Sequence, residues 1–170
     1  MTARYRIQQG LRALFAFSQP VERELAARYL TPDLLACFDT MRRGEQQHGL
    51  SVLRQLLAEG SIPDDLGVAA LLHDVGKSRY PFPVWEKTLV VLVRAFAPRL
   101  FDRLSAGQET NRLCRPFVLG VHHPAWSTEI ARAAGASERA VWLIAHHADN
   151  PASHPHLQLL ERLQAADDAN

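Results

Sequence analysis

The sequence predicts an all-α fold, because helical signals run along the whole chain and strand signals are missing. Apolar residues recur at intervals of three and four, which places them on one face of a helix. No segment has the sustained apolar–polar alternation of a half-buried strand. The 170 residues, of which 47% are apolar and 22% charged, suffice for one globular domain with a sizeable core.

Capping residues, prolines and glycines predict where the first helices begin and end. Thr31 followed by Pro32 is a typical helix start and Gly60 a typical stop, so we expect one long helix over residues 31–59. The next helix follows Pro63 and carries the apolar run 67–72. It should fade near Gly76, because the connector Tyr80-Pro81-Phe82-Pro83 forbids its continuation.

The remainder of the chain predicts more helices and no linker. We expect residues 1–170 to form a single domain, with its core in about residues 31–170 and N-terminal helices in residues 1–30. The further helices are expected over residues 84–97, 111–121, 126–134 and 137–147, and from His156 to the C-terminal end.

Charge and cysteine content exclude several classes of protein. Nineteen Lys and Arg against eighteen Asp and Glu leave a net charge of +1, which gives no general attraction to nucleic acid polymers or anionic membranes. Cys37 and Cys114 are too far apart in sequence for a CxxC pair, which argues against a thiolate zinc site or a disulfide framework. The N-terminal residues lack the features of a secretory signal, so we expect a cytoplasmic protein.

No membrane span is expected either. The most hydrophobic stretch, residues 88–93, is stopped by Arg94 and Pro98 and is far shorter than the roughly 20 apolar residues that cross a bilayer. Helices of this composition are usually buried in globular domains, so we interpret the stretch as a core helix. An amphipathic helix lying on a membrane surface over residues 85–104 is the alternative.

Ionisable residues on the apolar face of the expected 31–59 helix are the first candidates for a site. Glu45 and His48 share that face, and burying them without partners would cost a few kcal/mol each. His48 is therefore either a hydrogen-bonded core histidine or a metal ligand. The residues of this face are Leu34, Phe38, Met41, Glu45, His48, Val52 and Leu56.

A second candidate is the pair His73-Asp74, which follows directly on the apolar run 67–72. A structural hydrogen bond would satisfy the pair, but a metal uses it better, because imidazole supplies a nitrogen and a carboxylate can bridge two cations. One further helical turn brings Lys77 to the same side. Lys77 is either a phosphate-binding group or a helix-ending cation; the chain has one other lysine, Lys87.

Two more histidine pairs, His122-His123 and His146-His147, end or interrupt apolar segments. Adjacent helical residues diverge by about 100°, so both members of a pair reach one site only where a helix end points into it. We expect at least one ligand from each pair, and the pattern does not decide between His122 and His123. Near the C-terminal end, Asp167 falls on the apolar stripe and Asp168 on the polar side, so periodicity favours Asp167.

Together these residues resemble the HD superfamily of metal-dependent phosphohydrolases. His48, His73-Asp74 and Asp167 match the order of its H…HD…D signature, and the string LLHDVGK is close to its usual form. His123-Pro124 with Glu129-Ile130 and the His146-His147 pair are similar to the HPxxGxEI and HH segments of the HD-GYP branch, with Ser127 where glycine is usual. The resemblance implies an HD-domain helical bundle.

By the same resemblance the site holds two metal ions. The first ion would be bound by His48, His73, Asp74 and Asp167, and the second by His123, His146 and His147 around a bridging Asp74. Lys77 would contact the substrate phosphate. Two features of the HD-GYP branch are missing: the residues after the HH pair lack a DGxGYP loop, which argues against hydrolysis of cyclic di-GMP, and Gly44 replaces the glutamate of a third metal site.

The sequence therefore predicts a hydrolase of small phosphate esters, such as phosphomonoesters, nucleotides or cyclic nucleotides, with Asp74 and Lys77 as catalytic residues. A set of imidazoles and carboxylates suits Mn, Fe, Co, Ni or Zn. Two alternatives stay open. One is a sensor module that binds metal and nucleotide without turnover, and the other is a di-iron oxygenase with a similar ligand set. The sequence predicts no oligomeric state.

Overall fold

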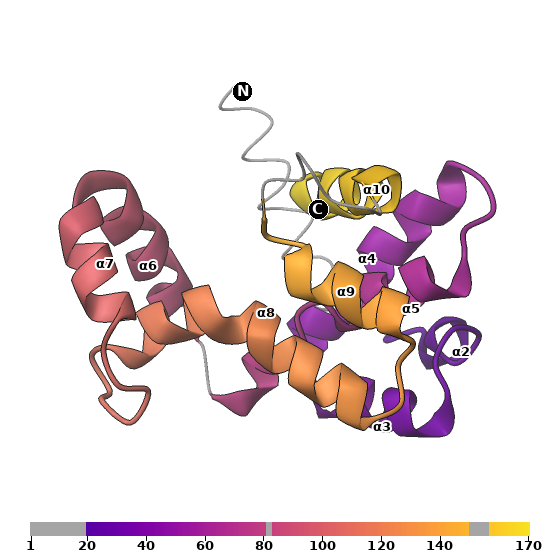
Figure 1. The fold of residues 1–170 in the computed structure, drawn as a ribbon, viewed down its shortest axis with the longest axis horizontal. Helices are drawn as coiled ribbons and strands as arrows, with labels where there is room; N and C mark the ends of the chain where they lie inside the picture. The colour runs from indigo at the N-terminus through magenta and orange to yellow at the C-terminus, as the bar shows by residue number, and fades with distance from the viewer. Residues whose placement is uncertain (1–19, 81–82, 150–156) are drawn as a thin grey trace.

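The computed structural model describes residues 20–80, 83–149 and 157–170, and every regular element in these ranges is a helix (Figure 1). The all-α prediction is confirmed. None of the described helices combines the length and the apolar content that crossing a bilayer requires. The elements are α2 (Arg23–Ala26), α3 (Pro32–Thr40), α4 (Arg43–Ala58), α5 (Asp64–Leu72), the 3-10 helix η1 (Val75–Arg79), α6 (Val84–Phe96), α7 (Pro98–Ser105), α8 (Arg115–Ala133), α9 (Glu138–His146) and α10 (Leu157–Asp168).

Helix α5 is the centre of the hydrophobic core. Every residue from Leu66 to Leu72 is buried, which is the pattern of a helix covered on all sides. Helices α3, α4, α9 and α10 pack around it (Figure 1). His73 and Asp74, which directly follow Leu72, are therefore buried in the core and do not reach the surface.

The other long helix, α8, connects two parts of the molecule. Its C-terminal half packs on α9 and on η1, beside the core. Its N-terminal half carries α6 and α7, which lie apart from the remaining helices (Figure 1). The contact between α7 and α8 includes the rings of Phe101 and Phe117, whose centroids lie 6.1 Å apart.

The expected 31–59 helix is in fact two helices. Thr31 caps the start and Gly60, with a φ of 131°, ends the second helix as predicted. In between, Met41 and Arg42 are extended, and the side-chain amide of Gln46 donates to the carbonyl of Phe38 at 3.0 Å. No proline or glycine marks this break, so the local sequence gave no signal of it.

The helices expected over residues 111–121 and 126–134 are, conversely, one continuous helix. α8 runs from Arg115 to Ala133 through Pro124, and residues 111–114 before it form turns. Proline removes a single main-chain hydrogen bond, and the helix continues because Ser127 and Thr128 beyond it are packed into the protein. The hydroxyl of Thr128 donates to the Pro124 carbonyl at 2.7 Å.

The interpretation of residues 88–93 as a core helix is wrong. They belong to α6, and within this helix Leu89, Val91 and Leu92 are 40%, 65% and 48% exposed. Composition alone could not place this helix, because its neighbours α7 and α8 cover only one side of it.

Two further expectations have partial answers. The 137–147 helix is confirmed as α9, with the Ser137 hydroxyl accepting a hydrogen bond from the Ala140 amide at 3.1 Å. The expected N-terminal helices in residues 1–30 correspond to α2 alone among the described residues, since residues 1–19 lie outside them. Pro81 and Phe82 of the expected connector and the expected helix start at His156 also lie outside the described ranges.

Gly76 provides a test of the contact between η1 and α8. A Cβ at this position would lie 2.5 Å from the His123 carbonyl and 2.7 Å from the Ser127 amide nitrogen, while the Gly76 amide donates to the Ser127 hydroxyl at 2.8 Å. We expect Gly76→Ala to lower the free energy of unfolding by about 1–3 kcal/mol, because two backbones must move apart. Urea denaturation followed by circular dichroism measures it.

Gly120→Ala in the middle of α8 is the matched control. Its added Cβ would meet one side-chain atom at an ordinary 3.5 Å, so the higher helix propensity of alanine should stabilise the protein by up to about 1 kcal/mol. Equal effects of the two substitutions would contradict the close packing of η1 on α8.

Candidate metal centre

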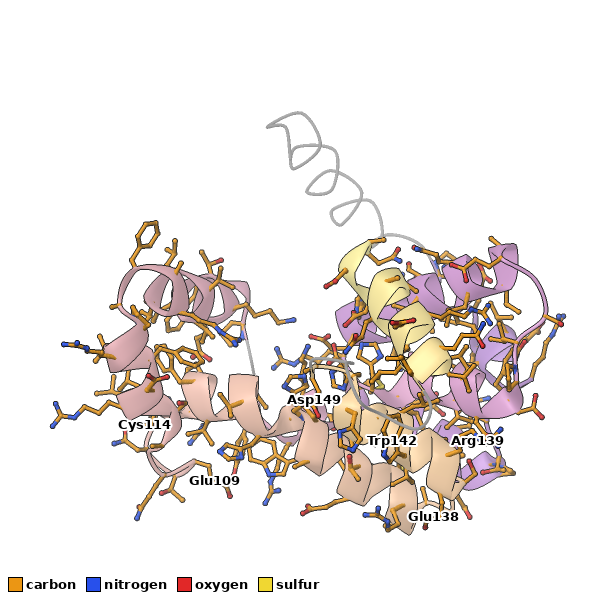
Figure 2. The ribbon with its side chains drawn as sticks, turned by 45° about the horizontal axis from the view of Figure 1, so that its top comes forward. Glu109, Cys114, Glu138, Arg139, Trp142 and Asp149 are labelled. Carbon is orange, nitrogen blue, oxygen red and sulfur yellow. The ribbon has the colours of Figure 1, made fainter. Side chains whose placement is uncertain are left out.

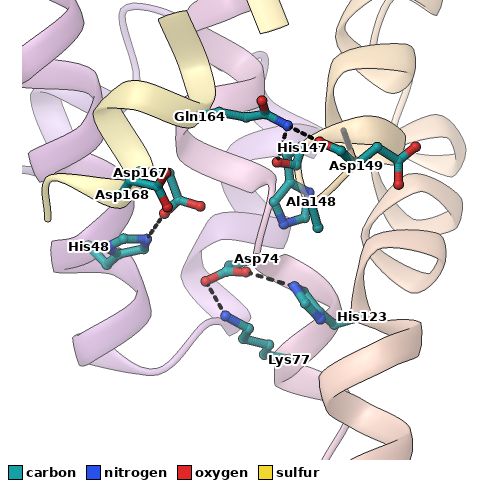
Figure 3. A pocket seen from close by; sticks show the side chains of 10 residues that line it. All are labelled: His48, Asp74, Lys77, His123, His147, Ala148, Asp149, Gln164, Asp167 and Asp168. Carbon is teal, nitrogen blue, oxygen red and sulfur yellow. Dashed lines mark hydrogen bonds and ion pairs between the residues drawn. The ribbon is translucent and has the colours of Figure 1, made fainter. Parts of the chain in front are cut away.

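Side chains from widely separated parts of the chain meet at a cavity of about 430 Å³ at the end of α5 (Figure 3). Helices α4, α8 and α10, the C-terminal end of α9 and the start of η1 each contribute to its walls. The lining residues are His48, Asp74, Lys77, His123, His147, Ala148, Asp149, Gln164, Asp167 and Asp168.

The end of α5 explains how two adjacent residues both serve one site. His73 still has helical backbone angles, whereas Asp74 has φ −102° and ψ 4°, between the α and extended regions. The helix therefore stops at this point and restarts as η1. Both side chains are almost fully buried, with 1% and 3% of His73 and Asp74 exposed.

Two groups of three potential metal ligands share Asp74. In the first, His48, His73 and Asp74 offer ligand atoms that all lie within 4.8 Å of one another. In the second, the same is true of Asp74, His123 and His147. Oδ1 of Asp74 lies 3.4 Å from Nε2 of His123, and Oδ2 lies 3.6 Å from Nε2 of His73. The two oxygens of one carboxylate thus face the two groups.

Asp167 joins the first group from α10. Its Oδ1 lies 2.7 Å from Nε2 of His48 and 3.5 Å from Nε2 of His73. Asp168 is exposed at the rim, as the apolar periodicity of the last helix predicted. Asp167 rather than Asp168 therefore faces the cluster (Figure 3).

Three of the imidazoles are oriented in the same way. Each donates a hydrogen bond from Nδ1 to a main-chain carbonyl three or four residues earlier: His73 to Ala70 at 3.1 Å, His123 to Leu119 at 3.2 Å, and His147 to Ile144 at 2.8 Å. In each case the partner belongs to the same helix or the turn that ends it. The main chain thereby fixes each ring and directs Nε2 to the cavity, which is the arrangement by which proteins orient metal-binding histidines.

Buried polar atoms without hydrogen bonds show that these residues fit a cation. Nε2 of His73 and Oδ1 of Asp74 are both buried and lack a hydrogen-bond partner among the described residues. Their nearest opposite charges lie 3.4–3.6 Å away, beyond the usual 2.7–3.2 Å of an N–H···O bond. Unpaired buried polar groups cost about 1–3 kcal/mol each, and a bound metal ion would remove that cost.

The electrostatics of the cluster favour bound cations as well. Burial opposes ionisation of Asp74 and Asp167, yet the neighbouring imidazoles and Lys77 hold the pKa of Asp74 well below its usual range, and His48 and His73 do so for Asp167. Burial, together with the charge of His73, lowers the pKa of His147 to about 4. At neutral pH the site thus contains two ionised carboxylates and a neutral His147, as metal ligation needs. Burial opposes the charge of His73, but Asp74 and Asp167 raise its pKa above the usual value, so a metal ion that binds His73 would displace a proton.

Lys77 also lies where the sequence predicted. The turn of η1 brings its Nζ to 2.6 Å from Oδ2 of Asp74, at the wall of the cavity. Burial opposes its charge, but Asp74 and Glu45 keep the pKa of Lys77 above its usual value. Lys77 is therefore a fixed positive charge beside the shared carboxylate.

His146 is a correction to the expected ligand set, since it belongs to neither group. Its Nδ1 lies 2.6 Å from Oδ2 of Asp149, and its ring packs on Trp142 at 4.5 Å on the other side of α9. The reason is the 100° step between adjacent helical residues, which lets His147 alone reach the cavity. By the same geometry His123 reaches it, while His122 is exposed and stacks on Trp126.

Gln164 is a supporting residue that sequence reasoning missed. Its side-chain amide donates to the carbonyls of His147 at 2.9 Å and Asp149 at 2.6 Å, so it holds the end of α9 against α10. The signal was present in the sequence, because Gln164 precedes Asp167 by three residues and so lies near it on the same helix.

No family model, curated protein or solved structure matches the chain.

The shared carboxylate leads to a prediction about metal binding. We expect protein reconstituted with Mn²⁺ to bind two ions. Asp74→Asn should lower the affinity of both sites by more than the ~10–100-fold that is typical when a metal ligand loses its hydrogen-bond partner. His147→Ala should weaken the second site and keep the first. Calorimetric titration with Mn²⁺ measures both.

Asp167→Asn and Asp168→Asn form a matched pair for the same titration. The first should weaken one site, while the second should change little because Asp168 is at the rim. Loss of metal with Asp168→Asn and retention with Asp167→Asn would contradict the observed phase of α10.

Proposed function

We propose that the chain is a metal-dependent phosphohydrolase of the HD type, acting on a small phosphate ester in the cytoplasm. The observation that carries the proposal is the carboxylate of Asp74. Two groups of histidines share this carboxylate, and the ammonium group of Lys77 lies beside it. A purely structural His–Asp pair needs neither a second group of histidines nor a lysine at the cavity wall.

The ligand set follows from the two groups. The first ion would be held by His48, His73, Asp74 and Asp167, and the second by Asp74, His123 and His147. When bound, two such cations neutralise phosphoryl charge and lower the pKa of water far enough to provide a nucleophile near neutral pH. Mixed nitrogen and oxygen donors suit Mn, Fe, Co, Ni or Zn better than Mg.

The residues of the chain itself would bind and orient the phosphate. Nζ of Lys77 lies next to the shared carboxylate, so an oxygen of a phosphate at the cavity would meet its charge directly. Asp74 is 3% exposed at the end of the buried helix α5, and such burial strengthens the electrostatic interactions of its carboxylate. Positioning and charge stabilisation are the main catalytic contributions that a protein makes to phosphoryl transfer.

The cavity suits a small substrate. Its volume of about 430 Å³ is within the range of pockets for small molecules. Phosphomonoesters, nucleotides and cyclic nucleotides are the substrate classes that fit this size and charge, and we propose no nucleic acid polymer as a partner.

The two alternatives, a non-catalytic sensor and a di-iron oxygenase, need the same ligands but make no catalytic use of Lys77. We therefore expect Lys77→Met to reduce turnover of the best phosphate ester by about 10²–10³, the usual cost of removing one positioned charge donor. Metal content should remain unchanged, because the ligands are intact. A colorimetric phosphate-release assay with metal analysis of the same samples measures both.

Lys87→Met is the matched control, since it removes the other lysine of the chain, whose ammonium group contacts Glu45 outside the cavity wall. It should leave turnover nearly unchanged. Equal activities of wild type and Lys77→Met at equal metal occupancy would remove Lys77 from the mechanism. Absence of phosphate release from every ester, with oxygen consumption by the iron-loaded protein, would favour the oxygenase.

A further inference from the structure

The outer face of α6 is exposed and apolar. Phe96 is 83% exposed and Trp85 65%, and Leu89 and Leu92 lie between them with nearly half of their surface in solvent. Single exposed apolar residues are normal in proteins, but a contiguous set of this size is typical of an interaction surface.

The spacing of these side chains is that of a helix–helix contact. Residues 85, 89, 92 and 96 are separated by four, three and four positions, which is the spacing of the contact positions of two paired helices. We call these four residues the α6 stripe. Thr88 and Ala95 flank the stripe on one side; both are exposed and neither is charged.

The two cations of α6, Lys87 and Arg94, lie on the side of the helix opposite the stripe and contact groups within the protein. Lys87 forms an ion pair with the carboxylate of Glu45 on α4. The guanidinium of Arg94 lies over the ring of Phe101 on α7, at 5.2 Å from its centroid. An amphipathic helix that binds anionic membranes directs cations outward around its apolar face, so this arrangement favours a protein surface as the occupant.

The size of the face fits a dimer. From the exposed fractions of its four residues, the α6 stripe presents roughly 500 Å², so a symmetric pair would bury roughly 1,000 Å² in total, about the minimum for a specific interface. Helices α6 and α7 lie apart from the core helices in both views of the ribbon (Figure 1, Figure 2).

We propose that the α6 stripe binds the α6 stripe of a second copy of this chain in an antiparallel, two-fold symmetric pair. The spacing of four, three and four is the same in both directions, which makes the stripe complementary to itself when one helix is reversed. In this register Leu89 faces Leu92 of the second copy, and Trp85 faces its Phe96. The proposal does not depend on the activity of the metal centre.

Sedimentation equilibrium of the full chain over a range of concentrations tests the proposal. Wild type should form a dimer, and Leu92→Glu and Phe96→Glu should each weaken it at least ~100-fold, because each places two carboxylates in an apolar interface. Leu113→Glu is the control: Leu113 is 78% exposed but outside the stripe, so its substitution should leave the dimer intact. Melting temperatures and helical circular dichroism of all variants verify that they fold.

A mixing experiment tests the register. Leu89→Lys and Leu92→Glu should each be monomeric alone, but their mixture should form a heterodimer, because one contact becomes a Lys–Glu pair while the other remains Leu–Leu. A wild-type chain that is monomeric at all concentrations, or a dimer that both stripe variants leave unchanged, would overturn the proposal. So would a monomer that instead co-sediments with phosphatidylcholine–phosphatidylglycerol vesicles, which would identify the face as a membrane-binding surface.

Discussion

The burial of the Asp74 carboxylate at the end of an apolar helix is the constraint on which the rest of the structure depends. An ionised carboxylate in such surroundings costs several kcal/mol unless opposite charges and hydrogen bonds compensate it. Nζ of Lys77 supplies one such charge at 2.6 Å from the Asp74 carboxylate. Nε2 of His73 and Nε2 of His123 lie within 3.6 Å of the same carboxylate. The helices that carry these groups, η1 and α8, are held beside α5 in part by this requirement.

The same constraint connects the fold with the proposed chemistry. The main-chain carbonyls of Ala70, Leu119 and Ile144 fix three imidazoles before any ligand arrives, so helix backbones preorganise the site. Two buried polar atoms, on His73 and Asp74, nevertheless have no hydrogen-bond partner within the part of the chain that the structure describes. Hydrogen bonding within the chain thus satisfies the cluster incompletely, and a pair of cations would complete it.

Sequence reasoning predicted much of the site because periodicity reports which side of a helix a residue occupies. It correctly placed Asp167, and not Asp168, on the apolar side of the last helix, and it correctly placed Lys77 beside Asp74. Both predictions depend only on the local helical periodicity. It failed where tertiary packing decides: the break at Met41 has no local signal, α8 continues through Pro124, and α6 is exposed despite its composition. His146 was included with His147 through a family resemblance, although the step between adjacent helical residues directs only one of them into the cavity.

Electron paramagnetic resonance of the protein loaded with two equivalents of Mn²⁺ tests the central claim most directly, because it reports whether two ions are neighbours. If Asp74 bridges them, as the shared carboxylate suggests, the spectrum should show exchange coupling at full loading, and Asp74→Asn should abolish it. Spectra of isolated Mn²⁺ ions at every loading, or a failure to bind the metal at all, would contradict a dinuclear centre at Asp74.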